Sequence, residues 1–292
     1  PNLGRHADDI AIVRSTYTDA PAHGAATLIQ HNGTFTDPRP SVGSWVLYGL
    51  GTENQNLPGF ITMRPGGAPD ARTFNNSFLP GTYQGTFVDS NNTRIEDIIK
   101  NIKSDFTSSK DQRKQLDLLL KLNEVHKQKR QAEGDLEARI NTFELAYRMQ
   151  TDASEAFDIA GEKPEVVAKY GANAQGRQML IARRLLERGV RFVQVSQGGW
   201  DLHGGIAQRA KRNADQLDPG IGALIDDLKE KGMFEDTLIY ITSEFGRTST
   251  EDGGGGRSHN ARGFSTVFIG GGVKGGFSYG ATDEIGSAAV KD

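Results

Sequence analysis

The chain has 292 residues, of which 34 are Lys or Arg and 37 are Asp or Glu, so its formal net charge is −3. This length allows a large buried core in one or two domains, and the charge shows no basic excess that would favour nucleic acid as a partner. The absence of cysteine excludes disulfides, thiolate metal sites and cysteine nucleophiles. No apolar run of about 18 residues occurs, so the sequence predicts no membrane span.

A short apolar run predicts a buried strand over residues 9–14, and after a polar turn a helix is expected over residues 22–30. Residues 32–89 are rich in Gly, Pro, Asn and Thr without a sustained period, so we expect a loop-rich excursion with short strands such as residues 60–63. Thr18 stands between the first strand and its helix. A hydroxyl there is an activated nucleophile if a metal lies near, or a helix-capping residue if none does.

Helical spacing dominates the middle of the chain. Apolar residues recur at this spacing across residues 94–150, so we expect the segment to be mostly helix. Its Lys and Arg residues fall largely between the apolar ones, which is typical of a solvated helix face. A further helix over residues 177–188 is expected to end at Gly189, because glycine commonly terminates helices.

A strand, a helix and a second strand follow one another in the C-terminal half. Residues 190–195 and 237–242 form the two apolar runs, and residues 206–231 between them carry one apolar stripe with Pro219 inside. Such a crossover predicts two parallel strands in one sheet with a right-handed connection. With a last strand over residues 266–269, the pattern indicates an α/β fold whose mostly parallel sheet lies between helices.

Asp201 and His203 lie after the strand at residues 190–195 and just before the next helix. The carboxyl ends of parallel strands are where open α/β sheets keep their binding sites. Because the two residues are two positions apart in an extended segment, their side chains point to the same side. Asp and neutral His are both ligands of zinc and similar divalent ions. A helix cap beside a surface histidine would give the same spacing, so both interpretations stay open.

Glu244, Arg247 and His259 follow the strand at residues 237–242. A carboxylate at the end of so apolar a strand is costly unless it is paired, bound to a metal or capping a backbone amide. Arg247 is either a salt-bridge partner of Glu244 or a clamp for an oxyanion such as phosphate or sulfate. His259 stands in a glycine-rich loop, where a lone histidine is most often a surface residue. Glu244 and His259 follow the end of a strand, as Asp201 and His203 do. We therefore expect these four candidate ligands to converge on one site.

The string of motifs resembles the family filed as domain of unknown function 1501, a sulfatase-like family of the alkaline phosphatase and sulfatase superfamily. The match runs along nearly the whole chain. Its pieces are Arg14-Ser15, Thr18-Asp19, residues 41–45, 49–58, 78–85, 189–195 and 280–284, Trp200-Asp201-Leu202-His203, and Ser243-Glu244-Phe245-Gly246-Arg247-Thr248.

This resemblance implies a single sulfatase-like α/β domain over residues 1–292, alkaline phosphatase-like and truncated at both ends. It implies one divalent metal, such as Ca²⁺, Zn²⁺ or Mg²⁺, held by Asp201, His203 and His259. Because family members often carry an export signal, it also implies an exported or periplasmic protein.

The chain departs from the superfamily pattern in two places. A second metal of the superfamily uses an Asp-His pair, which reads Glu244-Phe245 here, so a carboxylate is kept and an imidazole is lost. The hydroxyl nucleophile falls around residues 18–20, where Ala20 has no hydroxyl and Thr18 is the candidate.

Together these observations predict a metal-dependent hydrolase of sulfate or phosphate esters. Asp201, His203, Glu244 and His259 are the candidate ligands, Thr18 is the candidate nucleophile, and Arg247 is the candidate anion clamp. The expected partner is an anionic ester, and neither a nucleic acid nor a membrane span is expected. The alternative is a non-catalytic binding protein that keeps the sulfatase-like fold.

Overall fold

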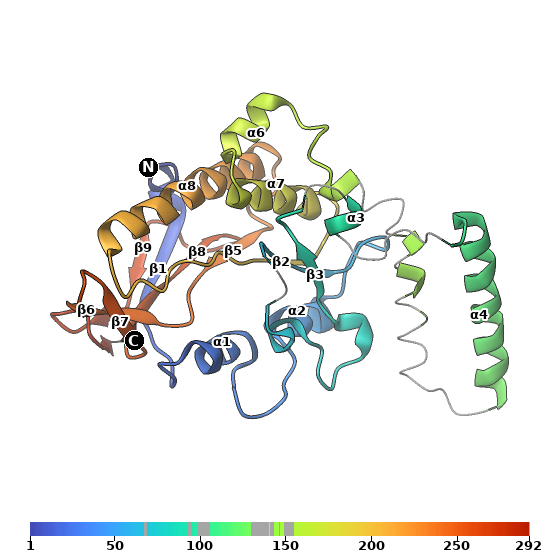
Figure 1. Cartoon of the computed structure of the whole chain (residues 1–292), viewed down its shortest axis with the longest axis horizontal. Helices are drawn as coiled ribbons and strands as arrows, with labels where there is room; N and C mark the ends of the chain where they lie inside the picture. Colours follow the sequence, from blue (N-terminus) through green and yellow to red (C-terminus); the bar gives the residue numbers. More distant parts are fainter. Residues whose placement is uncertain are drawn as a thin grey trace. The chain divides into compact units, whose positions relative to one another are not determined.

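The computed structural model describes residues 1–66, 69–92, 95–98, 106–129, 140, 143–145, 147–148 and 155–291 of the chain (Figure 1). They form two compact units, each assembled from separate stretches of sequence. The first unit comprises Pro1–Pro38, Lys163–Arg183 and Gln197–Asp292, and the second comprises Arg39–Glu162 and Arg184–Ser196.

The first unit contains a four-stranded mixed sheet. Its strand order is β5 (Leu238–Ile241), β8 (Phe264–Gly270), β1 (Ile10–Thr16) and β9 (Phe277–Tyr279). Strand β8 runs antiparallel to both of its neighbours, whereas β1 and β9 are parallel. Ile269 of β8 and Ala11 of β1 are buried, so each central strand contributes to the core.

The first unit also contains helices. They are the 3₁₀ helix η1 (Leu3–Asp9), α1 (His23–Asn32), α6 (Pro164–Tyr170), most of α7 (Ala174–Leu186) and α8 (Ile206–Glu230). Helix α8 lies along one side of the sheet (Figure 1). Its predicted apolar stripe is buried from Ile221 to Leu228, and Pro219 does not divide it into two helices.

Two short antiparallel pairs complete the first unit. One is the hairpin of β6 (Gly246–Glu251) and β7 (Arg257–Asn260), and the other joins β10 (Ala281–Thr282) to β11 (Ala289–Lys291). The glycine-rich stretch between β6 and β7 is therefore the tip of a hairpin.

The second unit contains a three-stranded parallel sheet. Its strand order is β3 (Thr86–Asp89), β2 (Phe60–Arg64) and β4 (Phe192–Val195). Phe60, Ile61 and Met63 of the central strand are fully buried, as expected for a parallel strand covered on both faces. Among its described residues, the helices of this unit are α2 (Val42–Leu50), η2 (Ala71–Phe74), η3 (Gly81–Tyr83), α3 (Ile95–Ile98) and α4 (Ser109–Lys129).

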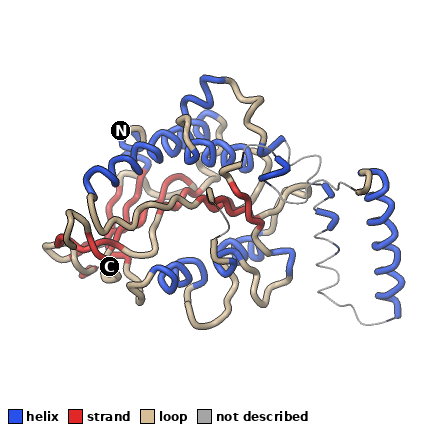
Figure 2. Tube along the Cα trace, viewed as in Figure 1, coloured by secondary structure: helices blue, strands red, loops and turns tan. Residues whose placement is uncertain are grey.

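Most predicted elements are present, and Figure 2 shows helices on either side of the strands of the first unit. Strands β1, β4, β5 and β8 and helices α1, α7 and α8 lie within two or three residues of their expected bounds. Gly189 follows α7 with a positive φ of 74°, as predicted for a terminating glycine. Helices α3 and α4 agree with the helical segment expected over residues 94–150, of which residues 99–105 and 130–139 lie outside the described residues.

Strand pairing corrects the predicted sheet. Strands β4 and β5 were expected to be parallel neighbours, but β4 pairs with β2 and β5 pairs with β8, so they belong to different sheets. The chain between β5 and β8 forms a hairpin and no helical crossover, and for this reason β8 returns antiparallel. The fold is thus mixed α/β with several sheets, of which only some are parallel.

Within residues 32–89, β2 confirms the short strand predicted at residues 60–63, whereas the helix α2 was not predicted. The nine residues of α2, two of which are glycines, are too few for a helical period to be recognised. Within the described part of the chain, no helix is both long and apolar enough to cross a bilayer.

Candidate functional site

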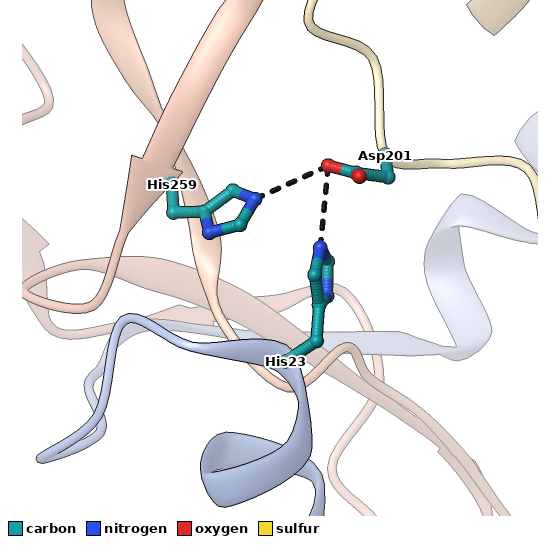
Figure 3. A group of neighbouring side chains, drawn as sticks. All are labelled: His23, Asp201 and His259. Carbon is teal, nitrogen blue, oxygen red and sulfur yellow. Dashed lines mark hydrogen bonds and ion pairs between the residues drawn. The ribbon is translucent and has the colours of Figure 1, made fainter.

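Three histidines surround one carboxylate oxygen in the first unit. The Oδ1 atom of Asp201 lies 3.0 Å from the Nε2 atom of His203, 3.2 Å from that of His259 and 3.3 Å from that of His23. Figure 3 shows two of these imidazoles, those of His23 and His259, pointing toward the Asp201 carboxylate. All three imidazoles thus contact the same carboxylate oxygen, and the ligand atoms of His23, Asp201 and His259 lie within 4.8 Å of one another.

The four residues come from three separate segments. His23 is the first residue of α1, His259 lies in β7, and Asp201 and His203 belong to the loop that precedes α8. The cluster is accessible, since the side chains of Asp201 and His203 are 50% and 45% exposed.

The tip of the β6–β7 hairpin fastens the loop that carries Asp201 and His203. The backbone N–H of Arg257 donates to the carbonyl of Leu202 at 2.9 Å, and that of Gly205 donates to Gly254 at 3.0 Å. Gly204 and Gly255 form an isolated antiparallel bridge at the same place. This backbone pairing fixes the two ligands relative to His259, which the same hairpin carries.

Each of the three imidazoles has its second nitrogen, Nδ1, against an oxygen acceptor. The pairs are His23 with Oε1 of Glu244 at 2.6 Å, His203 with Oδ2 of Asp252 at 2.7 Å, and His259 with the carbonyl oxygen of Pro21 at 2.7 Å. Because carbonyl and carboxylate oxygens only accept, each Nδ1 carries a proton and donates it. In a neutral imidazole, Nε2 then presents a lone pair toward Asp201, which is the arrangement that second-shell oxygens impose on metal-binding histidines.

This donor set fits a divalent cation. The Nε2 atoms of His203 and His259 are only 3.0 Å apart, so their lone pairs need a shared proton or a shared cation. The Nε2 atom of His23 is buried without a hydrogen-bond partner. Ligand atoms about 2.1 Å from a tetrahedral ion lie about 3.4 Å from one another, close to the separations around Asp201.

Charge leads to the same conclusion. The imidazoles contact the carboxylates of Asp201, Glu244 and Asp252, and one guanidinium, that of Arg247, contacts Asp201. With neutral histidines the cluster has an excess of negative charge that a divalent cation would balance.

Arg247 is bound within the cluster. Its Nη2 atom donates to Oδ1 of Asp201 at 2.7 Å, and its Nη1 atom donates to the carbonyl of Arg257 at 3.3 Å. The hydrogen bond from Arg247 is the main reason why the pKa of Asp201 lies well below its ordinary value. The sequence left open a pairing of Arg247 with Glu244, and the structure pairs it with Asp201.

An apolar cluster lies beside the imidazoles. Phe245 is 4% exposed and belongs to a cluster with Ala20 and Ala26. Its ring centroid is 4.9 Å from that of His23 and 4.4 Å from that of His259. Packing against Phe245 therefore limits the rotation of both imidazoles.

Thr18 is held near the end of β7 by its backbone, whose N–H donates to the carbonyl of Ala261 at 2.9 Å. Its hydroxyl oxygen is buried and has no hydrogen-bond partner in the described part of the chain. The hydroxyl is thus not hydrogen-bonded to the cluster.

Of the four residues that were expected to converge, the structure brings together Asp201, His203 and His259, and it places Glu244 on the Nδ1 atom of His23 instead. Sequence reasoning assigned no role to His23 or to Asp252. The position of His23 is a signal that could have identified it. His23 begins the helix that follows the first strand, and Asp201 and His203 likewise lie between a strand and the next helix. Asp252 carries no comparable signal, because it is one acidic residue in a polar hairpin.

No curated protein and no solved structure matches the chain significantly. One family model, described as "Protein of unknown function (DUF1501)", matches residues 1–292. The chain therefore belongs to the DUF1501 family.

Proposed function

We propose that this protein is a divalent-metal-dependent hydrolase of sulfate or phosphate esters. The observation that carries the proposal is the convergence of Nε2 atoms on Oδ1 of Asp201, with every Nδ1 occupied by an oxygen acceptor. The resemblance of the sequence motifs to sulfatase-like enzymes supplies the substrate class.

Asp201, His203 and His259 would hold the ion. A divalent ion at this position supplies Lewis-acid chemistry, which stabilises the charge that develops on ester oxygens by several kcal/mol. The protein prepares for it by keeping the Asp201 carboxylate ionised through Arg247 and by fixing the tautomers of the histidines through their acceptors.

Arg247 would bind the anionic group of the ester. Its guanidinium has five N–H groups, and the contacts with Asp201 and Arg257 leave others for sulfuryl or phosphoryl oxygens. Arg247 therefore has two tasks in this proposal, since it orients a metal ligand and attracts the substrate.

Thr18 is the nucleophile in this proposal. Its hydroxyl has no competing hydrogen bond, and its backbone is tied to Ala261, two residues beyond His259. Thr18→Ser should keep hydrolysis, whereas Thr18→Ala should abolish it without changing metal content. Equal activity of the two variants would remove Thr18 from the mechanism.

The test is metal analysis of the purified protein together with hydrolysis of 4-nitrophenyl sulfate and 4-nitrophenyl phosphate. Wild-type protein should retain a divalent metal and cleave at least one of the two esters, and a chelator should stop the reaction. His203→Ala should lose both metal and activity, because a ligand is removed. The control is His126→Ala, which changes a histidine outside the cluster and should behave as wild type.

The rival function is non-catalytic binding by a protein that keeps the metal site. It is favoured by the buried cluster of Ala20 and Phe245, which stand where the resemblance expects a hydroxyl nucleophile and a second imidazole. Wild-type protein that binds a metal and cleaves neither ester would establish the rival.

A further inference from the structure

We propose that His23 is a fourth ligand of the divalent ion, and that Glu244 is a positioning residue which orients His23 and does not bind the ion itself. This inference rests on the metal site of the proposed function. It changes the role expected for Glu244 and assigns one to a histidine that the sequence motifs leave without any.

The first argument is the state of the His23 imidazole. Its Nδ1 atom lies 2.6 Å from Oε1 of Glu244, so this nitrogen carries the proton. Its Nε2 atom is buried and lies 3.3 Å from Oδ1 of Asp201, without hydrogen-bond geometry. A buried lone pair facing a carboxylate oxygen is unfavourable unless a cation lies between them.

The second argument is the position of Asp201 relative to the other ligands. One ligand atom from each of His23, Asp201 and His259 lies within 4.8 Å of the other two. The Nε2 atom of His203 is 3.0 Å from both Asp201 Oδ1 and His259 Nε2. His23 thus forms a three-ligand group with Asp201 and His259, and His203 adjoins this group through its contacts with the latter two residues.

The third argument concerns Glu244. Its carboxylate stands to His23 as the carboxylate of Asp252 stands to His203, that is, on the nitrogen that does not face Asp201. Second-shell acceptors of this kind fix the ring and raise the basicity of the ligating nitrogen. Glu244 therefore acts on the ion through His23.

Packing supports the same assignment. The His23 ring contacts the rings of Phe245 and His259, with centroids 4.9 Å and 4.4 Å away. Because it is also the first residue of α1, its backbone is held by the helix. His23 is thus oriented before any ion binds, which lowers the entropic cost of coordination.

The experiment measures the dissociation constants of Zn²⁺ and Co²⁺ by competition with a chelator for wild type, His23→Ala, Glu244→Ala and the double variant. His23→Ala should weaken binding by at least about 100-fold, since it removes a ligand, and Glu244→Ala by about 10- to 100-fold. The double variant should bind no more weakly than His23→Ala, because Glu244 acts only through His23.

Two further variants keep the test decisive. Glu244→Gln retains an oxygen acceptor for Nδ1 and should stay within about tenfold of wild type, whereas an amide would be a poor replacement for a directly bound carboxylate. His23→Gln replaces His23→Ala if the latter fails to fold, as judged by circular dichroism of the metal-free protein. The visible absorption of bound Co²⁺ should change in His23→Gln and stay unchanged in Glu244→Gln.

Wild-type affinity in the folded His23 variants would overturn the inference, and so would additive losses from His23→Ala and Glu244→Ala. Both results leave the proposed hydrolase intact, with three ligands. Metal binding without ester hydrolysis would instead reject the proposed hydrolase and leave the ligand assignment to be decided by the affinities. A wild-type protein that binds neither ion would overturn both.

Discussion

The Nε2 atoms of His203 and His259 lie 3.0 Å apart, although the two residues belong to different segments of the chain. Their Nδ1 atoms are occupied by Asp252 and by the carbonyl of Pro21, so the short separation reflects how each ring is anchored from outside. The anchors place both lone pairs where a cation would neutralise their repulsion. The geometry of the site therefore depends on residues that would not touch the ion.

Gly256 is the first such residue. A Cβ atom there would lie 2.0 Å from the carbonyl carbon of His203 and 2.4 Å from the amide nitrogen of Gly204, and both are backbone atoms that cannot move independently. We expect Gly256→Ala to displace His203, to destabilise the fold by roughly 1–3 kcal/mol, and to weaken metal binding by at least about tenfold. Thermal unfolding and chelator competition measure the two effects.

The matched control for this prediction is Gly198→Ala. A Cβ atom at Gly198 meets nothing within 4 Å, and its φ is not positive, so stability and metal affinity should stay close to wild type. Equal behaviour of the two variants would show that the close approach of Gly256 to His203 does not position the ligand.

Phe245→Ala should loosen the imidazoles of His23 and His259. The substitution removes a buried ring from the cluster with Ala20, and phenylalanine-to-alanine changes in a core cost about 3–5 kcal/mol. Chemical denaturation of the metal-free protein should show this loss, and metal affinity should fall with it. Phe277→Ala, at a side chain 42% exposed, is the control and should have a much smaller effect. Unchanged affinity in folded Phe245→Ala would mean that the ring does not orient the histidines.

Asp227→Ala should be strongly destabilising. The carboxylate is 7% exposed, accepts from the hydroxyl of Tyr170 at 2.8 Å and pairs with Lys169 at 2.7 Å. Burial raises the pKa of the Tyr170 hydroxyl, which therefore stays protonated and would be left without its acceptor. Removing one partner of a buried pair costs about 3–5 kcal/mol. Asp215→Ala on the same helix breaks only an exposed pair with Lys211 and should cost at most about 0.5 kcal/mol in the same denaturation assay.

Asp218 should make the fold sensitive to acid. Burial alone would raise the pKa of its carboxyl, but the amides of Leu3 and Asn2, each donating at 2.8 Å, outweigh burial and lower the pKa to about 2. A lowered pKa stabilises the folded state above the ordinary value of 3.8, and this contribution is lost as the pH falls toward about 2. The stability difference between wild type and Asp218→Asn should therefore be constant near neutral pH and shrink over that interval. Parallel acid denaturation of the two proteins would contradict the assignment.

The positions of most elements follow from the sequence because periodicity and glycine placement act locally. The apolar run of β1, the buried stripe of α8 and the terminating glycine at Gly189 each depend on neighbours within a few residues. The same local logic places Asp201 and His203 after one strand and Glu244 after another. These three residues could therefore be identified as candidate ligands from the sequence, before any contact between them was known.

Strand partners and side-chain partners depend on contacts between distant segments, and only the tertiary structure decides these. The residues of a strand do not specify which strand it will join, so neither the antiparallel direction of β8 nor the pairing of β4 with β2 could be predicted. His23 reaches Asp201 because the start of α1 is held at His259, which contacts the carbonyl of Pro21 and the His23 ring. In the same way, the fold places Arg247 against Asp201 and not against Glu244. The sequence determines which chemical groups stand at the ends of the strands, and packing determines which of them meet.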